Sequence, residues 1–501
     1  MRACGVLLPV ASLPSQYGIG GFSEEAYRFV DQLKEAGQSY WQVLPLGPTG
    51  FGDSPYQSFS TFAGNPYYID LKDLQKRGYL SEEELAKEVR TGKNRKIDYE
   101  DLYHTRFKVL RKAFDKSNIA GNVEFLEYCS KNEQWLEDYA LFMVIKGEFE
   151  GRGWDYWPME YRRRDKQVLE QFQAEHKSDI LFWKFVQYIF ADQWKKLKEY
   201  ANDKGVMIIG DIPIYVAFDS ADSWSHPELF QFDENIMPIK VAGCPPDAFA
   251  VTGQLWGNPL YDWEEHKKTN YEWWLSRIRY CATLYDVIRI DHFRGFDEYY
   301  AIPYGDKTAE FGHWEKGPGM DLFHAVQREL KGVKIIAEDL GFLTDSVLKM
   351  LKDSGYPGMK VLEFAFNASG ESDYLTYHYD KNCVVYTGTH DNETLAGWYN
   401  NLQKEDKAFL LRYLGKKRLK TKKAVQEIIR LAMNSVADTC IIPIQDYLGL
   451  GNEARINYPS TLGGNWIWQM NGTEMTSKVI QRMREFACVY GRIPKSGSGE
   501  K

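Results

Sequence analysis

Apolar runs and amphipathic helical patterns alternate along most of the chain. Eight runs rich in β-branched and aromatic residues predict strands that are covered on both faces. Helical patterns follow most of them, and this alternation predicts a parallel α/β sheet. Eight strands imply a (β/α)8 barrel, the TIM barrel, and a doubly wound open sheet is the alternative. The predicted strands are residues 6–10, 40–46, 206–214, 286–291, 333–338, 359–366, 384–391 and 440–445.

The first helical pattern follows a glycine-rich loop. Ser23 has the position of an N-cap, and two glutamates follow it in the first turn. The preceding glycines do not form a G-x-G-x-x-G motif, so a dinucleotide-binding oxidoreductase is the weakest of the alternatives. The apolar positions at the spacing of one buried helix face are Ala26, Phe29, Val30 and Leu33.

Residues 71–200 differ in character from the rest of the chain. Charged residues and helix formers dominate there, and strand patterns nearly vanish. We therefore expect a large, mostly helical insertion subdomain after the second strand. We expect it to lie within a single catalytic barrel domain that covers residues 1–501, with a long loop after the third strand.

Composition narrows the class of protein. The formal charge of −8, from 62 basic and 70 acidic residues, gives no electrostatic footprint for nucleic acid. No apolar run could span a membrane, and Pro9 breaks the N-terminal run, so a buried strand is favoured over a signal peptide. Seven scattered cysteines predict reduced thiols and a cytoplasmic location. Aromatic residues reach 15%, and aromatic faces can stack on sugar rings.

Carboxylates stand where several predicted strands end. In a barrel these ends meet at one mouth, where active sites lie. A pair of carboxyl groups, one ionised and one protonated, is the equipment of glycoside chemistry. Arg289 and Asp291 point the same way on one strand, so we expect the arginine to lower the pKa of Asp291. The residues selected by position are Asp211, Asp291, Glu338 or Asp339, and the pair His390 and Asp391.

These side chains also have structural explanations. Asp291 could serve merely as an ion-pair partner of Arg289 or Arg294. Asp211, before Ile-Pro, could hold the backbone, and residues 390–391 could form a strand-to-helix turn. Their joint occurrence at strand ends favours a functional site over any of these explanations.

Two further alternatives concern Glu338 and the histidines. Glu338 could cap the next helix, although Thr344 or Asp345 fits a cap better. His292 and His390 could share a divalent metal, but the chain has neither an H-E-x-x-H motif nor a paired Cys/His spacing. Hydrogen bonding to sugar hydroxyl groups explains the histidines as well, so no metal or cofactor is expected.

A series of motifs, in order and nearly end to end, resembles the 4-alpha-glucanotransferases (amylomaltases or disproportionating enzymes) of glycoside hydrolase family 77. Such a set is far more specific than any one of its members. The motifs are SLPSQYGIG at 12–20, GFGDSPYQS at 50–58, GNP at 64–66, GDIPI at 210–214, GQLWGNP at 253–259, RIDHFRG at 289–295, AEDLG at 337–341, GTHD at 388–391 and RINYP at 455–459.

The resemblance implies a role for each matching residue. Asp291 would be the nucleophile, Glu338 the general acid/base, and Asp391 the stabiliser of the distorted sugar. Arg289 would orient Asp291, and His390 would hold sugar hydroxyl groups. Tyr56 would be the aromatic platform beside the donor sugar, and 247–256 would belong to a loop that arches over the cleft. The substrate-binding residues implied in this way are Ser54, Tyr56, Asp211, Asp247, Gln254, Trp256, Arg289, His292, His390, Asn457 and Asn465.

The implied activity is transfer of α-1,4-glucan segments from a donor to an acceptor oligosaccharide, with retention, by a monomer or homodimer. The alternatives are an α-1,4-glucan hydrolase on the same barrel and a non-catalytic glucan-binding protein; the intact trio Asp291, Glu338 and Asp391 argues against the latter. The family pattern more often has glycine at 460 and arginine at 469, where this chain has Ser460 and Gln469.

Overall fold

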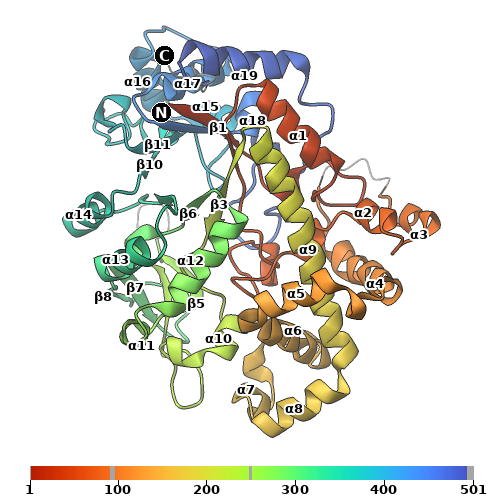
Figure 1. The fold of residues 1–501 in the computed structure, drawn as a ribbon. Coiled ribbons are helices and arrows are strands. Elements are labelled where there is room, and N and C mark those ends of the chain that lie inside the picture. Colours follow the sequence, from red (N-terminus) through yellow and green to blue (C-terminus); the bar gives the residue numbers. More distant parts are fainter. Residues whose placement is uncertain (1, 91–95, 247–250, 494–501) are drawn as a thin grey trace, which may run out of the picture.

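The computed structural model describes residues 2–90, 96–246 and 251–493 (Figure 1). Eight parallel strands form one curled sheet in the order β10-β11-β12-β1-β2-β3-β6-β9, which confirms the predicted barrel. Each of the seven ladders joins strands that follow one another around the barrel, so β1 lies between β2 and β12. The barrel strands are β1 (Ala3–Leu7), β2 (Tyr40–Gln42), β3 (Met207–Ile212), β6 (Val287–Ile290), β9 (Ile335–Ala337), β10 (Gly358–Val361), β11 (Cys383–Tyr386) and β12 (Thr439–Pro443).

Alternate side chains of these strands fill the barrel. In β6, Val287 belongs to the interior cluster, and the strand period of two places Arg289 on the same inward face. The outward side chains pack against the helices in one large core. The interior cluster consists of Leu7, Ile209, Val287, Ile336, Met359, Val361, Val384, Tyr386 and Ile441.

The barrel is joined between β9 and β10 by contacts outside the ladder. The backbone N–H of Ala337 donates to the carbonyl of Pro357 at 3.0 Å, and that of Met359 donates to the Asp339 carboxylate at 2.6 Å. A Cβ added to Gly358 would lie 2.7 Å from an Asp339 oxygen, so glycine leaves room for this carboxylate. Asp339 therefore links the two strands within the core.

Several strands end earlier than the sequence predicts. β1 ends at Leu7, and a 3-10 turn (Val10–Ser12) replaces the predicted end of the strand, because Pro9 has no N–H to continue the ladder. β10 likewise gives way to a 3-10 turn, Leu362–Phe364, where the pattern predicts strand as far as 366. The candidate site residues follow other strands: Asp291 comes directly after β6 and Glu338 directly after β9.

Helix α1 (Glu24–Glu35) has the predicted buried face. Ser23 stands at its N-cap position, but the serine hydroxyl makes no capping hydrogen bond. The four buried side chains are Ala26, Phe29, Val30 and Leu33.

Helices dominate the segment after β2 and gather on one side of the barrel, at the lower right of Figure 1. The longest, α9, returns the chain to β3 and packs against α6 and α1. That these helices form an insertion subdomain within one catalytic domain stays a prediction. The helices are α2 (Leu71–Lys76), α3 (Glu82–Ala86), α4 (Tyr99–Ser117), α5 (Val123–Lys131), α6 (Glu133–Glu148), α7 (Met159–Arg162), α8 (Lys166–Glu175) and α9 (Lys177–Asp203).

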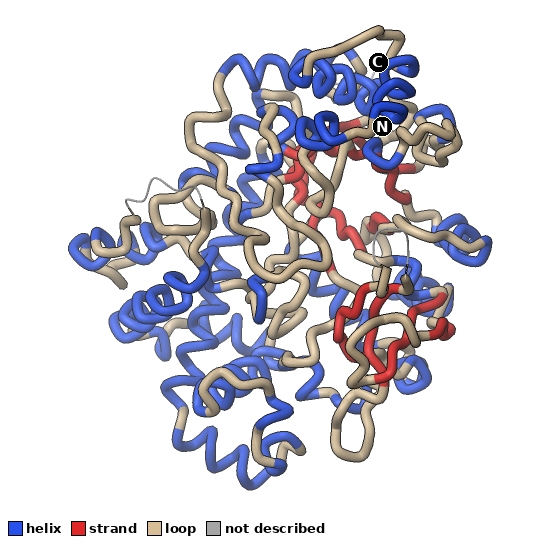
Figure 2. Tube along the Cα trace, turned by 180° about the vertical axis from the view of Figure 1, so that it is seen from behind, coloured by secondary structure: helices blue, strands red, loops and turns tan. Residues whose placement is uncertain are grey.

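A second, antiparallel sheet stands apart from the barrel strands (Figure 2). It occupies part of the segment that we expected as a loop after β3, and it continues after β6. The strand formers Tyr299, Tyr300 and Ile302 within 298–303 are its clearest signal in the sequence. Its strands, in the order β5-β4-β7-β8, are β4 (Lys240–Cys244), β5 (Gln254–Pro259), β7 (Glu298–Pro303) and β8 (His313–Lys316).

Further helices follow β3 and the later strands. Thr344 caps α14 by accepting from the backbone N–H of Val347, so the cap is the residue that the sequence favoured over Glu338. Among the described residues, no helix has the length and apolar character that a membrane crossing requires. These helices are α10 (Ala221–Ser225), α11 (Trp263–Lys268), α12 (Glu272–Leu284), α13 (Met320–Glu329), α14 (Asp345–Ser354), α15 (Leu395–Asn401), α16 (Lys404–Tyr413), α17 (Thr421–Asn434), α18 (Ile444–Leu448) and α19 (Ser477–Val489).

Candidate active site

Asp291 and Glu338 follow neighbouring strands of the barrel and meet at its mouth. The backbone N–H of His292 donates to one Glu338 carboxylate oxygen at 2.7 Å, and that of Leu340 donates to the other at 2.8 Å. His292 adopts a left-handed conformation, φ +54°, which costs a non-glycine residue about 1 kcal/mol or more. This turn sets Asp291 and Glu338 beside one another.

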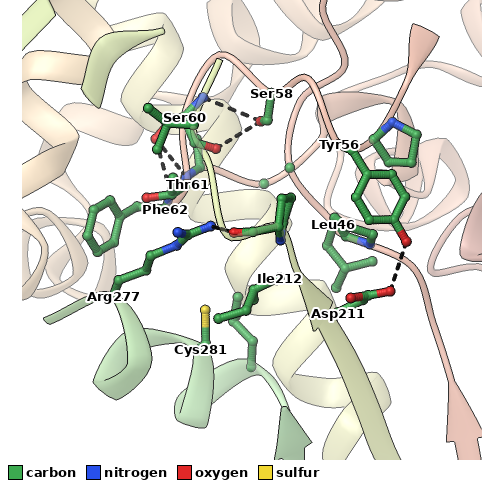
Figure 3. A pocket seen from close by; sticks show the side chains of 18 of the residues that line it. Leu46, Tyr56, Ser58, Ser60, Thr61, Phe62, Asp211, Ile212, Arg277 and Cys281 are labelled. Atoms are coloured by element: carbon green, nitrogen blue, oxygen red, sulfur yellow. Dashed lines mark hydrogen bonds between the residues drawn. The ribbon is translucent and has the colours of Figure 1, made fainter. Parts of the chain in front are cut away.

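Arg289 is the centre of a buried charge network beneath Asp291. Its Nη1 donates to both oxygens of Asp211 at 2.6 Å, and its Nη2 lies 3.1 Å from an oxygen of Asp291. The hydroxyl of Tyr56 donates to Asp211 at 2.8 Å (Figure 3). Since Asp211 is only 1% exposed, it acts on the cleft through Arg289 and Tyr56.

A small cavity lies behind Tyr56, enclosed by the loop of residues 55–64 and by Arg277 and Cys281 of α12 (Figure 3). Its volume is about 50 Å³. Ligand sites are typically about 300–1,000 Å³, so the cavity is too small for a sugar ring. Tyr56 lines both this cavity and the cleft described below.

The two facing carboxyl groups have different proton affinities. Burial raises the pKa of Glu338 to about 8, and the charge of Asp291 adds to this effect. Burial also raises the pKa of Asp291, to about 6, with Arg289 opposing the rise. The expectation that Arg289 would hold this pKa below its ordinary value is therefore wrong, because burial outweighs the ion pair. At neutral pH Glu338 carries the proton and Asp291 the charge.

Asp391 and His390 face this pair from the loop after β11. The Asp391 carboxylate accepts from the Asn457 amide at 2.6 Å and lies 3.4 Å from His390 Nε2. The Tyr56 ring stacks on His390, with centroids 5.1 Å apart and planes 16° apart. Arg455 donates to the backbone carbonyl of Asp391 at 2.7 Å and so fixes this turn. Sequence reasoning quoted Arg455 in a motif but gave it no role.

The opposite wall of the cleft contains His292 and the indole of Trp256. Their rings meet edge to face at 4.9 Å, and the Trp256 N–H donates to the Gln254 side chain at 3.1 Å. Burial lowers the pKa of His292 to about 3, with the charge of Arg294 contributing. His292 is therefore a neutral hydrogen-bonding group at neutral pH.

A continuous cleft joins these walls. Its deeper part has a volume of about 290 Å³, and a wider part of about 480 Å³ continues from it. Ser54, Trp256, Asn457 and Trp466 line both parts. The residues predicted from the sequence that line the deeper part are Ser54, Tyr56, Gln254, Trp256, Asp291, His292, His390, Asp391 and Asn457.

Sequence reasoning missed Trp466. Its ring lies 5.9 Å from those of both Tyr56 and His390, so the three form one aromatic cluster. Trp466 has a left-handed backbone, φ +63°, and its carbonyl accepts from the buried hydroxyl of Tyr99 on α4 at 3.1 Å. Two tryptophans separated by one residue, Trp466 and Trp468, were the available signal.

The remaining predicted residues lie at the edge of the site. Asn465 lines the wider part of the cleft, but its side chain holds the loop by accepting from the N–H of Tyr458 and donating to Thr461. Asp247 lies outside the described residues. Gln469 donates to the carbonyl of Leu13 at 2.9 Å.

The structural alternatives can be compared with these contacts. Arg294 does not pair with Asp291; it donates to the carbonyl of Phe342 at 2.7 Å. Asp339 accepts a hydrogen bond from the backbone N–H of Met359 and so links β9 to β10. Of the two candidates, Glu338 is therefore the one that lies at the mouth of the barrel. Within the part of the chain that the structure describes, no three His, Cys, Asp or Glu side chains form a group that could hold a metal ion.

The parallel barrel and the carboxyl-lined cleft at its mouth define a (β/α)8-barrel enzyme. A family model described as 4-alpha-glucanotransferase matches residues 8–476. The 4-alpha-glucanotransferases of Clostridium butyricum and Thermus thermophilus are 47% and 43% identical to this chain, over 96% and 98% of it and 99% of each relative. The amylomaltase of Streptococcus agalactiae, solved in complex with acarbose, is 40% identical, with a TM-score of 0.95 over 98% of this chain and all of that one. The chain belongs to the 4-alpha-glucanotransferase family.

Proposed function

We propose that this enzyme transfers α-1,4-glucan segments between oligosaccharides by two successive displacements, with Asp291 as nucleophile and Glu338 as general acid/base. The observation that carries the proposal is the contact of His292 N–H with Glu338, which sets a protonated carboxyl group beside an ionised one. Such a pair is what a retaining glycoside reaction requires. Family membership supports the choice of glucan as substrate.

In the first displacement, Asp291 attacks the anomeric carbon of the donor glucan. The bond from this carbon to the glycosidic oxygen breaks, and Glu338 gives that oxygen its proton, so the leaving glucan departs with a free 4-hydroxyl group. Asp291 becomes a glycosyl ester, and Glu338 becomes a carboxylate. Its two backbone donors, the N–H groups of His292 and Leu340, then stabilise the charge that it gains.

In the second displacement, the 4-hydroxyl group of an acceptor glucan gives its proton to Glu338 and attacks the same carbon. The ester bond breaks and Asp291 regains its charge, which Arg289 stabilises at 3.1 Å. Two inversions give net retention, and a new α-1,4 bond replaces the old one.

Asp391 is proposed to stabilise the positive charge that develops on the sugar between the two displacements. Asn457 holds one of its oxygens, and His390 lies beside the other. Stacked Tyr56 and His390 then form the floor on which the reacting sugar lies. An oxocarbenium-like transition state is stabilised by a carboxylate placed in advance at its edge.

Incubation with maltotriose tests the proposal. Transfer gives glucose together with maltotetraose and longer products, without any rise in the number of reducing ends. Hydrolysis gives maltose and glucose alone, with a rise in reducing ends. Binding of maltotriose without any turnover would favour the non-catalytic alternative.

Two variants test the residue assignment. We expect Asp291→Asn and Glu338→Gln each to lower the transfer rate by about three orders of magnitude or more, with the fold retained. Asp297→Asn is the matched control, because Asp297 follows on the same segment and accepts a hydrogen bond from Ser346. Near-normal disproportionation by either of the first two variants contradicts the assignment.

A further inference from the structure

Arg294 is a buried cation that holds two separate segments together. The residue is 4% exposed, and no carboxylate of the described residues pairs with it. Its guanidinium lies 3.9 Å from the centre of the Trp314 ring, over the face, and donates to the carbonyl of Phe342 at 2.7 Å. One side chain from the turn after Asp291 thus fixes the small sheet against the loop after β9.

Both residues that this arginine contacts have aromatic side chains that are open to solvent. Phe342 is 76% exposed, and Trp314 is 37% exposed. The rings of Tyr300 and Trp314 meet edge to face with centroids 5.2 Å apart, so the indole is fixed on β8. Trp314 is thus an exposed ring held in place, and Phe342 is an exposed ring on a backbone held in place. Two exposed aromatic side chains that share one buried arginine are typical of a binding surface.

Phe342 lies close to the proposed general acid along the chain. The N–H of Leu340 already binds Glu338, and Phe342 is two residues further on. Four residues of extended chain span at most about 14 Å, so the ring is within a few sugar units of the Glu338 carboxyl group. Arg294 connects Trp314 to this loop, because it contacts both the Trp314 ring and the Phe342 carbonyl.

The side of the cleft to which Phe342 belongs follows from the chemistry. A general acid must lie beside the glycosidic oxygen that it protonates, and this oxygen leaves with the departing glucan. The acceptor glucan later occupies the same place. The loop after Glu338 therefore borders the leaving and acceptor glucan, whereas Tyr56, His390 and Asp391 surround the donor sugar.

We propose that Trp314 and Phe342 form an acceptor platform, a surface on which the glucose units of an acceptor α-1,4-glucan stack beyond the unit that takes the new bond. This inference rests on the proposed function. Sugar rings stack on aromatic faces. A short acceptor does not reach the platform, whereas a longer acceptor stacks on both aromatic rings.

Arg294 is the positioning residue of the platform. A guanidinium over the indole face adds a cation–π contact, and its fixed fork reaches the Phe342 carbonyl at the same time. Lysine has the charge without the fork, so it cannot make both contacts. The platform therefore depends on arginine at this position for its geometry.

Acceptor kinetics test the platform. With amylose as donor, the KM of fluorescently labelled maltose, maltotriose and maltotetraose is measured as acceptor. We expect Phe342→Ala and Trp314→Ala to raise the KM by an amount that grows with acceptor length, to about tenfold for maltotetraose, while kcat changes less than about twofold. Phe342→Tyr, which keeps the ring, should restore the wild-type dependence on length.

Tyr377→Ala is the matched control. Tyr377 is 65% exposed, but its ring contacts are with His378 and with Tyr413 of α16, and it should leave every acceptor KM unchanged. Equal effects of Phe342→Ala on all acceptors, or none, would overturn the platform. Arg294→Lys is a second test of the platform. It should raise the KM of long acceptors selectively, although both rings are still present.

The outcomes separate the two proposals. Wild-type enzyme that forms no ladder from maltotriose contradicts the proposed function itself. A normal ladder, with a dependence on acceptor length that Phe342→Ala and Trp314→Ala leave unchanged, contradicts the acceptor platform alone.

Discussion

Arg289 binds Asp211 more closely than it binds Asp291: its Nη1 lies 2.6 Å from both oxygens of Asp211, and its Nη2 lies 3.1 Å from Asp291. Asp211 therefore takes up much of the arginine's charge, and its own charge raises the pKa of Asp291. We expect Asp211→Asn to lower this pKa and to move the acidic limb of the kcat/KM profile to lower pH. Arg289→Gln should move the limb the other way, and an unmoved limb in both variants contradicts the relation.

The wild-type enzyme should show a bell-shaped pH profile. Transfer needs Asp291 ionised and Glu338 protonated, and the two pKa values are about 6 and about 8. Activity should fall below pH about 6 as Asp291 gains a proton, and above pH about 8 as Glu338 loses its own. Measurement of kcat/KM from pH 4 to pH 10 checks both limbs. A rate that stays flat to pH 10 is incompatible with Glu338 as the acid.

Glu338 should also make the fold less stable in alkali. Its folded pKa lies above the ordinary value, so the folded state binds more protons and the free energy of unfolding falls as pH rises between about 4 and 8. Glutamine cannot ionise. We expect Glu338→Gln to be more stable than the wild type at pH 9 by on the order of 1 kcal/mol or more, and closer to it at pH 5. Denaturant midpoints at both pH values test this, with exposed Glu405→Gln as control.

The hydroxyl of Tyr99 connects helix α4 to the cleft through the carbonyl of Trp466. Tyr99→Phe should lower the free energy of unfolding by about 1 kcal/mol, because a buried hydrogen bond is lost. Trp466 is then held less firmly in its left-handed backbone, so KM should rise by about two- to fivefold with little change in kcat. Tyr139→Phe is the control: the Tyr139 hydroxyl is buried without a partner among the described residues, and its removal should not destabilise the fold.

Ser460 has a backbone that favours glycine. Its φ is +64°, in the left-handed region, and it lines both parts of the cleft. Ser460→Gly relieves about 1 kcal/mol of strain but makes the unfolded chain more flexible by about the same amount. We therefore expect thermal unfolding to change little, by about 0–1 kcal/mol of stabilisation. Gly463→Ser, at φ +76° with open space around it, should destabilise by about 1 kcal/mol.

Local pattern predicted much of the barrel. The eight strands carry long-range pairing, but each is a buried apolar run that is visible without its neighbours. The rule that barrel sites lie at strand ends then selected Asp291, Glu338 and Asp391, which the structure gathers at one mouth. The catalytic roles of these three residues remain part of the proposal.

Other features depend on information that no local window holds. Burial raises the pKa of Asp291 and the charge of Arg289 lowers it, so the direction of the shift depends on which effect is larger. The extent of burial is known only from the complete fold. The small sheet is built from segments on both sides of β6, so its pairing is not visible in either part alone. Trp466 reaches the cleft because an aromatic residue of α4 holds its carbonyl, a contact across 367 positions.

The position of β1 between β2 and β12 has a consequence for synthesis of the protein. A chain emerging from the ribosome can pair its first strands early, but β1 has one free edge until residues 439–443 arrive. The aromatic cluster of the cleft forms later still, because Trp466 follows that last strand in the chain. A nascent chain is therefore unable to assemble the complete cleft until both the last barrel strand and Trp466 have been translated.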